Sequence, residues 1–207
     1  MKEQVVIVGN GGHAKVIIDL LNSSSQFEII GCTSSSSKGT YTAGVPIIGD
    51  DTILPQLFDQ GIKHAFIAIG DNQIRKKLFE KLKQLHFEFV NAISPFSYIA
   101  PSVSLGTGIA VMPGAVINTD SKIKDNVIIN TGSTIDHDNV IEEHAHIAPG
   151  SHLAGHVTVG EGAFIGTGTK IIPEITIGQW SIAGAGSVII RNVESHTKVA
   201  GVPAKKI

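Results

Sequence analysis

The chain has 207 residues, a formal net charge of −2, 42% hydrophobic residues and 16% charged residues. This length suits one domain or two small ones, and the composition is that of a globular protein with enough apolar material for a core. The charge balance lacks the basic patch of a nucleic-acid-binding protein, and an aromatic content of 5% argues against a base-stacking surface.

Cysteine usage and hydropathy indicate the cellular compartment of the protein. Cys32 is the sole cysteine, so no internal disulfide is possible and the sequence fits a reducing compartment. No stretch approaches the ~18 consecutive apolar residues that suggest a membrane span. The N-terminus opens into a strand pattern and not into a charged leader followed by an apolar region. We therefore expect a cytoplasmic protein that binds neither membranes nor nucleic acid.

The first part of the chain predicts alternating strands and helices. Short apolar runs that end at glycine or at turn residues indicate buried parallel strands, and amphipathic runs indicate helices. The expected elements are strands over residues 4–9, 27–31, 64–70 and 87–91, and helices over residues 15–22, 52–60 and 73–85. Asp71 and Asn72 are expected to cap the last helix. This alternation predicts a small α/β domain over residues 1–91.

A glycine-rich turn joins the first strand to the first helix. Its sequence is Gly9-Asn-Gly-Gly-His13, and glycines in this context let backbone N–H groups and a helix N-terminus approach a phosphate. A dinucleotide site would also need an acidic residue after the second strand to bind the ribose hydroxyls. Cys32 and Thr33 stand there instead, which argues against NAD. A plain scaffold domain without a ligand is the alternative.

From residue 93 to residue 189, an aliphatic residue recurs at every sixth position. All seventeen positions except Ala183 hold Ile, Leu or Val. The seventeen are Ile93, Ile99, Leu105, Val111, Ile117, Ile123, Ile129, Ile135, Ile141, Ile147, Leu153, Val159, Ile165, Ile171, Ile177, Ala183 and Ile189. A small or β-branched residue often follows four positions later, as at Ala115 and Ser133. Hexapeptide repeats indicate a parallel β-helix. Three faces make a coil of 18 residues, so about five coils are expected.

The repeat and its tail define the second predicted domain, residues 92–207. Gly201-Val202-Pro203 in the tail predicts a rigid turn. A prism with exposed strand ends invites self-association, so we expect a homo-oligomer.

Five of the nine histidines lie within one 20-residue segment of the repeat: His137, His144, His146, His152 and His156. His137 lies between Asp136 and Asp138, and a neighbouring carboxylate can orient an imidazole and raise its basicity for general-base catalysis. Neutral imidazoles also bind zinc, and three histidines with a water make a hydrolytic or hydrating centre. The spacing leaves both kinds of site open.

Five motifs together carry a family resemblance: Gly9–His13, Ala68–Arg75, Asn130–Asp138, His146 followed by Ala148–Gly150, and Gly201–Lys205. In this order they resemble the hexapeptide-repeat acyltransferases, specifically the PglD/NeuD branch that acetylates nucleotide sugars and sialic acid. The resemblance covers essentially the whole chain. It implies an N-terminal Rossmann-like α/β domain, a left-handed parallel β-helix, and a homotrimer that binds acetyl-CoA in the grooves between neighbouring β-helices.

The resemblance also implies roles for individual residues. His137 matches the catalytic base and Asp138 the acidic residue that raises its basicity; the family usually has glutamate there, and Asp136 is the alternative partner. Contacts to acetyl-CoA are implied for His146, Gly155, Thr167, Ala185, Pro203 and Lys205, with the Gly155 N–H facing the carbonyl oxygen. Contacts to the sugar nucleotide are implied for Gly11, Gly12, His13, Cys32, Thr33, Gly70 and Asn130. A PglD-type relative carries paired aspartates where this chain has Cys32 and Thr33.

The expected activity is acetyl-CoA-dependent N-acetylation of a nucleotide-linked amino-sugar, of the UDP-4-amino-4,6-dideoxy-N-acetylhexosamine type, in glycan or polysaccharide biosynthesis. Transfer is expected to be direct, without an acyl-enzyme and without a metal. An O-acetyltransferase acting on sialic acid or a polysaccharide precursor is the nearest alternative. A γ-type carbonic anhydrase with stoichiometric zinc and a non-catalytic sugar-nucleotide binder are alternatives from other classes.

Overall fold

The structure is a computed structural model that describes residues 2–24, 26–35 and 39–207. The chain divides into two compact units, Met1–Ile93 and Ser94–Ile207. Within the residues described, no helix combines the length and the hydropathy that crossing a bilayer requires.

The first unit is built on a sheet with the strand order β3-β4-β2-β1-β5-β6. The strands are β1 (Glu3–Val8), β2 (Phe27–Thr33), β3 (Tyr41–Thr42), β4 (Val45–Gly49), β5 (His64–Ile67) and β6 (Glu88–Phe89). The strands β4, β2, β1, β5 and β6 run parallel to one another, and β3 pairs antiparallel with β4. The four predicted strands are confirmed. The β3–β4 hairpin was not predicted; Ala43 and Gly44 both have positive φ, as its tight turn requires.

Helices connect these strands as predicted. They are α1 (Gly12–Ser23), the short 3-10 helix η1 (Asp51–Ile53), α2 (Leu54–Asp59) and α3 (Asn72–Gln84). The Asp71 side chain accepts a hydrogen bond from the Ile74 N–H and so caps α3, as expected. α1 begins at Gly12, three residues earlier than predicted, and its N-cap Gly11 supplies no side-chain acceptor. The first N–H groups of α1 therefore point out of the glycine turn without a side-chain cap.

The core of the first unit joins the sheet to its helices. The buried residues of one cluster come from β1, β5, α2, α3 and the intervening segments: Val6, Val8, Leu54, Ile62, Ala65, Ile67, Phe79, Leu82 and Phe87. The rings of Phe79 and Phe89 stack with centroids 3.9 Å apart. This core holds the carboxyl ends of the parallel strands at one edge of the sheet.

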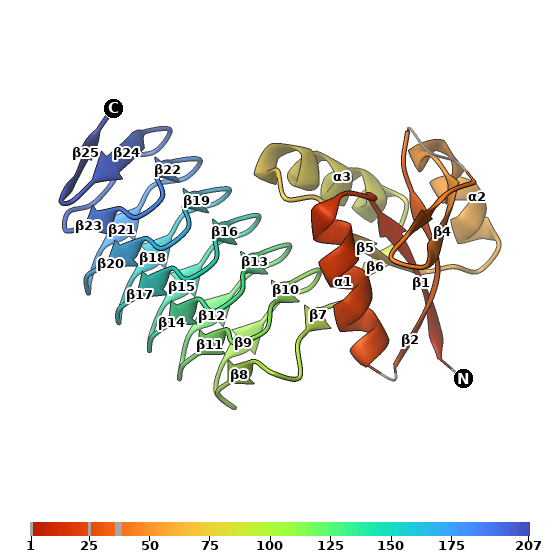
Figure 1. Cartoon of the computed structure of the whole chain (residues 1–207), viewed down its shortest axis with the longest axis horizontal. Coiled ribbons are helices and arrows are strands. Elements are labelled where there is room, and N and C mark those ends of the chain that lie inside the picture. Colours follow the sequence, from red (N-terminus) through yellow and green to blue (C-terminus); the bar gives the residue numbers. More distant parts are fainter. Residues whose placement is uncertain (1, 25, 36–38) are drawn as a thin grey trace. The chain divides into compact units, whose positions relative to one another are not determined.

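The second unit is a left-handed parallel β-helix, seen in Figure 1 as a regular ladder of short strands coloured from green to blue. After β7 (Ala92–Ile93) come β8 (Tyr98–Ile99), β9 (Ser104–Leu105), β10 (Ala110–Val111), β11 (Val116–Ile117), β12 (Lys122–Ile123), β13 (Ile128–Ile129), β14 (Thr134–Ile135), β15 (Val140–Ile141), β16 (His146–Ile147), β17 (His152–Leu153), β18 (Thr158–Val159), β19 (Phe164–Ile165), β20 (Lys170–Ile171), β21 (Thr176–Ile177), β22 (Ile182–Ala183) and β23 (Val188–Ile189). Strands of one face are 18 residues apart, as in the pairing of Ala110 with Ile128. The predicted coil length is confirmed.

The repeat fills the interior of the β-helix as predicted. Every sixth residue from Val111 to Ile189 is buried, and so are the small residues four positions later, such as Ala115 and Ser133. Burying one aliphatic side chain contributes roughly 1.5–3 kcal/mol to the free energy of unfolding. The stacked coils thus form one continuous core.

The corners of the β-helix turn through residues with positive φ, stacked one coil apart. One corner consists of glycines: Gly114, Gly132, Gly150, Gly168 and Gly186. A second corner is polar and carries Asp120, Asp138, His156 and Glu174 in the same left-handed conformation. Asp and His are among the non-glycine residues that tolerate this conformation best. The second corner contains the candidate catalytic residues.

The tail ends in a hairpin. β24 (Lys198–Gly201) pairs in parallel with β22, and β25 (Ala204–Lys206) pairs antiparallel with β24. The turn predicted at residues 201–203 is confirmed, whereas the two flanking strands were not predicted.

Candidate active site

Two successive turns of the second corner bring the candidate catalytic residues together. His137 and Asp138 lie between β14 and β15, and Gly155 and His156 lie one coil later, between β17 and β18. The His156 N–H donates a hydrogen bond of 3.1 Å to the His137 carbonyl oxygen. The 18-residue coil therefore stacks residue 155 on residue 137 and residue 156 on residue 138.

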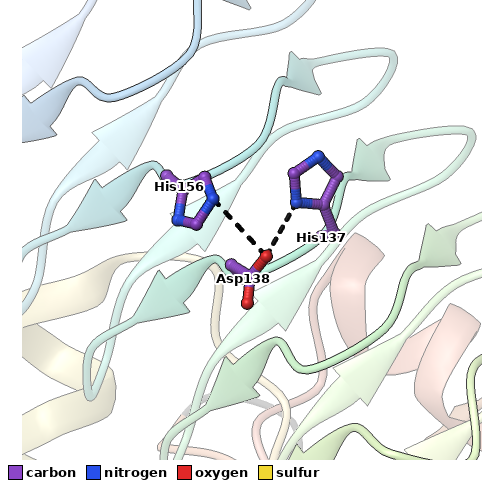
Figure 2. A group of neighbouring side chains, drawn as sticks. All are labelled: His137, Asp138 and His156. Atoms are coloured by element: carbon purple, nitrogen blue, oxygen red, sulfur yellow. Dashed lines mark hydrogen bonds and ion pairs between the residues drawn. The ribbon is translucent and has the colours of Figure 1, made fainter.

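Asp138 faces both imidazoles, as Figure 2 shows. Its Oδ2 accepts a hydrogen bond of 2.8 Å from His137 Nδ1 and lies 3.5 Å from His156 Nε2. The two rings meet edge to face, with centroids 5.3 Å apart. Because Nδ1 of His137 carries the donated proton, its Nε2 is the nitrogen that can accept a proton from a substrate.

The structure distinguishes the roles of the two aspartates beside His137. Asp136 Oδ1 accepts hydrogen bonds from the His137 backbone N–H, at 2.9 Å, and from Asn118 Nδ2, at 3.2 Å. Asp136 thus holds the backbone of the turn, while Asp138 contacts the ring. The hydrogen bond that His137 donates to Asp138 raises the pKa of His137 above its ordinary value, desolvation opposes this, and the negative charges of Asp136 and Asp138 add to it. Half of the His137 side chain is exposed, so a substrate can reach this base.

Gly155 lies directly against the His137 ring. A Cβ added to Gly155 would be 2.5 Å from Cε1 and 2.6 Å from Nε2 of His137, so only glycine permits this ring position. No residue among those described accepts a hydrogen bond from the Gly155 N–H. Gly155 is itself buried, with the His137 ring packed against it.

Asn139 fixes the catalytic corner from inside, and the sequence analysis missed it. It is fully buried, and its Nδ2 donates to the carbonyl oxygens of Asp136 (2.7 Å), His137 (3.2 Å) and Ala154 (2.9 Å). Its Oδ1 accepts from the Val157 N–H. Asn139 therefore ties the His137 turn to the next coil. The signal was present in the sequence, since Asn139 occupies an internal position that most repeats give to a small or apolar residue.

A second group of candidates lies on another face of the β-helix. His146 on β16 is 8% exposed, and its Nε2 accepts a hydrogen bond of 3.0 Å from Asn130 Nδ2. This makes His146 a neutral imidazole with its proton on Nδ1. Phe164 meets the His146 ring edge to face, with centroids 5.1 Å apart.

The remaining candidates for acetyl-CoA contacts are exposed and lie apart from the His137 corner. Thr167 and Ala185 follow β19 and β22, and Pro203 and Lys205 belong to the terminal hairpin. Within a single chain, His137 and its neighbours therefore lie at one corner of the β-helix. The other candidates lie on a different face, at a different corner or in the tail.

The His137 corner also has the composition of a metal site. His137, Asp138 and His156 each offer one ligand atom, all within 4.8 Å of one another, and all three side chains are exposed. Imidazole nitrogen and carboxylate oxygen are ligands that zinc accepts. The direct hydrogen bond from His137 Nδ1 to Asp138, however, already orients the ring for proton transfer without an ion.

In the first unit, a buried cation contacts the candidate Gly70 and lies near His13. Arg75 is 1% exposed and donates to the carbonyl oxygens of Ile69 and Gly70, each at 3.2 Å, and to Asn72 Oδ1 at 2.9 Å. Burial lowers the pKa of Arg75 to about 9, opposed by the charge of Asp71, so the guanidinium stays charged at neutral pH. Arg75 ends the Ala68–Arg75 motif, and its burial is not apparent from the sequence alone.

His13 at the start of α1 is neutral. Burial, and secondly the charge of Arg75, lower the pKa of His13 to about 4. Its Nε2 is buried and has no hydrogen-bond partner among the described residues. His13 therefore presents a neutral ring beside Gly11 and Gly12 at the α1 N-terminus.

A cavity of about 410 Å³ opens at the carboxyl ends of four adjacent strands of this sheet. Its lining comes from the residues at or just after the ends of β1, β2, β4 and β5, including Gly9, Thr33 and Asp51, and from Lys81 on α3. Ligands of open α/β sheets bind at this edge. Of the predicted pair, Thr33 lines the cavity. Cys32 is fully buried, does not line the cavity, and has a pKa raised to about 11 by burial.

Comparisons with known proteins agree with this architecture. The family described as "PglD N-terminal domain" matches residues 4–82, and "Bacterial transferase hexapeptide (six repeats)" matches residues 140–172. PerB from Caulobacter crescentus, solved in complex with CoA and GDP-perosamine, is 46% identical with a TM-score of 0.95, over 99% of this chain and 97% of that chain. The acetyltransferase domain of PglB from Neisseria gonorrhoeae FA1090 is 34% identical with a TM-score of 0.95, over the full length of both chains.

Curated relatives match a shorter region. UDP-N-acetylbacillosamine N-acetyltransferase of Bacillus subtilis (strain 168) is 38% identical over 116 residues, which is 53% of this chain and 51% of that protein. A further relative, the uncharacterized protein L142 of Acanthamoeba polyphaga mimivirus, matches over only 24% of its own length. The full-length likeness to PerB and PglB, together with both domain matches, identifies this chain as a member of the PglD-type family of hexapeptide-repeat sugar acetyltransferases.

Proposed function

We propose that this protein transfers the acetyl group of acetyl-CoA to the amine of a nucleotide-linked amino-sugar, with His137 as the general base. The observation that carries this proposal is the corner in which Asp138 holds His137 Nδ1 while Gly155 underlies the ring. The relatives support the substrate class, because PerB was solved with CoA and GDP-perosamine and the B. subtilis relative is named an N-acetyltransferase.

The chemistry follows from this geometry. His137 Nε2 takes a proton from the sugar amine as the amine nitrogen attacks the thioester carbonyl carbon. The carbonyl oxygen becomes an oxyanion, which the Gly155 N–H stabilises by donating a hydrogen bond. The carbon–sulfur bond then breaks, the amide forms, and the imidazolium returns its proton to the CoA thiolate. Cys32 is buried with a raised pKa, which opposes its use as an acyl carrier.

A homotrimer would complete the site. The His137 corner and the candidates Asn130, His146, Thr167 and Ala185 lie on different parts of one β-helix. Parallel packing of three β-helices would bring one protomer's corner against another protomer's face, with acetyl-CoA in the groove between them. We place this reaction in the cytoplasm, where acetyl-CoA and sugar nucleotides are both available.

Two related activities remain candidates for separate reasons. The same base could remove a proton from a sugar hydroxyl, which would make the protein an O-acetyltransferase. The His137, Asp138 and His156 group has the ligand types of a zinc site, as a γ-type carbonic anhydrase would need. The family membership favours acetyl transfer over hydration of carbon dioxide.

Thiol release from acetyl-CoA tests the proposal. The purified protein is assayed against nucleotide-linked 4-amino-sugars, nucleotide-linked sugars without an amine, and free sialic acids, and the products are identified by mass spectrometry. We expect release only with the amino-sugars. His137→Ala should reduce turnover by about 10²–10⁴-fold. His152→Ala, which removes an exposed histidine whose ring hydrogen-bonds to Thr134, is the matched control. Equal release with a sugar that lacks an amine would reject N-acetylation.

A further inference from the structure

The cavity of the first unit has two chemically different ends. At one end, Gly9 and Asn10 enter the glycine turn, and the uncapped N-terminus of α1 begins at Gly12. N–H groups at such a helix start favour a phosphate. At the other end, Thr33 and Asp51 stand after the carboxyl ends of β2 and β4. A nucleoside diphosphate whose phosphates occupy the first end would place its base at the second.

The end of the cavity at which the base would lie presents a fixed carboxylate, that of Asp51. The fully buried Thr33 donates a hydrogen bond of 2.6 Å from Oγ1 to Asp51 Oδ1. The neighbouring Asp50 serves a different purpose, because it caps η1 by accepting from the Thr52 N–H at 2.9 Å and from the Thr52 hydroxyl. Asp51 retains Oδ2 and a second lone pair on Oδ1 for further donors. The Thr33 hydroxyl thus orients Asp51 as an acceptor in the cavity wall.

The nucleobases differ in what they offer to such an acceptor. Guanine presents two adjacent donors, the ring N1–H and the exocyclic N2 amine, which match the two oxygens of one carboxylate. Uracil presents a single N3–H between two carbonyl oxygens, and these would face the carboxylate unfavourably. Paired hydrogen bonds to a charged group are stronger and more specific than single ones. The cavity volume of about 410 Å³ accepts either base, so the carboxylate decides between them.

We infer that Asp51, held by Thr33, reads the base of the sugar nucleotide and selects guanine over uracil. This inference rests on the proposed function for the presence of a nucleotide-linked substrate, and it departs from the UDP carrier that the family resemblance alone suggests. It makes the acceptor a GDP-linked amino-sugar. The apolar residues Val8 and Ile69 line the same cavity beside Gly9, at the end opposite Asp51.

Calorimetric titration of the full-length protein with GDP and UDP, without acetyl-CoA, tests this inference independently of catalysis. We expect the wild type to bind GDP about 10- to 100-fold more tightly than UDP. Asp51→Asn should lose that preference. The Asn oxygen can accept from the N1–H of xanthine, and the Asn amide can donate to the C2 carbonyl of xanthine. This variant should therefore prefer xanthosine diphosphate (XDP).

A gain of XDP binding would show that Asp51→Asn is folded and that residue 51 contacts the base, because an unfolded variant would not bind XDP. Thr33→Val, which keeps the side-chain shape but removes the donor to Asp51, should lower GDP affinity with less effect on UDP. Asp59→Asn changes an exposed carboxylate on α2 that does not line the cavity, and should bind like the wild type. Tighter binding of UDP than GDP, binding of neither, or equal losses for GDP and UDP in Asp51→Asn would overturn the inference. Intact GDP binding without acetyl transfer would instead reject the proposed function and leave the base assignment standing.

Discussion

The ring of His137 lies against Gly155, one coil further along the chain, with no room for a side chain between them. A Cβ at residue 155 would lie 2.5 Å from Cε1 of His137. Gly155→Ala should therefore displace the imidazole and reduce kcat by about 10²-fold, since misplacement of a catalytic group by about 1 Å has this effect. Steady-state kinetics measures the loss. The thermal midpoint of unfolding is the control, because a variant that merely unfolded would lose activity without any specific change at His137. An unchanged kcat would remove Gly155 from the site.

Asp138 should set the pH dependence of the reaction. The base acts in its neutral form, so kcat/KM falls as the pH drops through the pKa of His137, which Asp138 raises. Asp138→Asn removes the charge and weakens the acceptor, and the acidic limb of the pH–rate profile should move to lower pH while the plateau rate decreases. Asp120→Asn is the matched control, because Asp120 occupies the same corner one coil earlier. If both variants keep the wild-type profile, the Asp138–His137 pair is not the titrating group.

Asn139 should link the stability of the β-helix to the position of the base. Asn139→Ala leaves three carbonyl oxygens without this donor, and loss of buried hydrogen bonds costs about 1–3 kcal/mol in the free energy of unfolding. Urea denaturation measures this change, and turnover should decrease with it. Ser133→Ala removes one buried donor, to the Asn130 carbonyl oxygen, and should cost less and spare the His137 turn. Equal effects of the two variants would contradict a special role for Asn139.

Removal of metal should leave acetyl transfer unchanged. Asp138 orients His137 directly at 2.8 Å, so the base needs no ion. After dialysis against EDTA, turnover should equal that of the untreated protein, and elemental analysis should find no stoichiometric zinc. Activity lost on chelation and restored by zinc would show that His137, Asp138 and His156 act as metal ligands.

The internal repeat made most of the second unit predictable from the sequence. A strict six-residue period specifies which side chains face inward, and three faces specify the 18-residue coil. The same arithmetic stacks residues 137 and 155, and residues 138 and 156, before any coordinates are known. The repeat does not specify the direction of each side chain. In the structure Asp138, in the left-handed conformation, contacts the His137 ring, whereas Asp136 contacts the His137 backbone.

Other features depend on contacts that no local pattern encodes. Thr33 and Asp51 meet across 18 residues because β2 and β4 are neighbours, and β4 is the second strand of a hairpin that the sequence analysis did not predict. The charged Arg75 on α3 reads as a surface residue, yet the turn after β5 wraps its guanidinium in carbonyl oxygens. The first contact is set by the order of strands in the sheet, and the second by the path of the turn between β5 and α3.

The role of His137 is tested by the rate of acetyl transfer by the wild type and by His137→Ala, with acetyl-CoA and a GDP-linked 4-amino-sugar both at saturation. We expect turnover by the wild type and a decrease of about 10²–10⁴-fold in the variant. Calorimetry should show that the variant still binds CoA and the sugar nucleotide. Full turnover by the variant would contradict the assignment of His137 as the base.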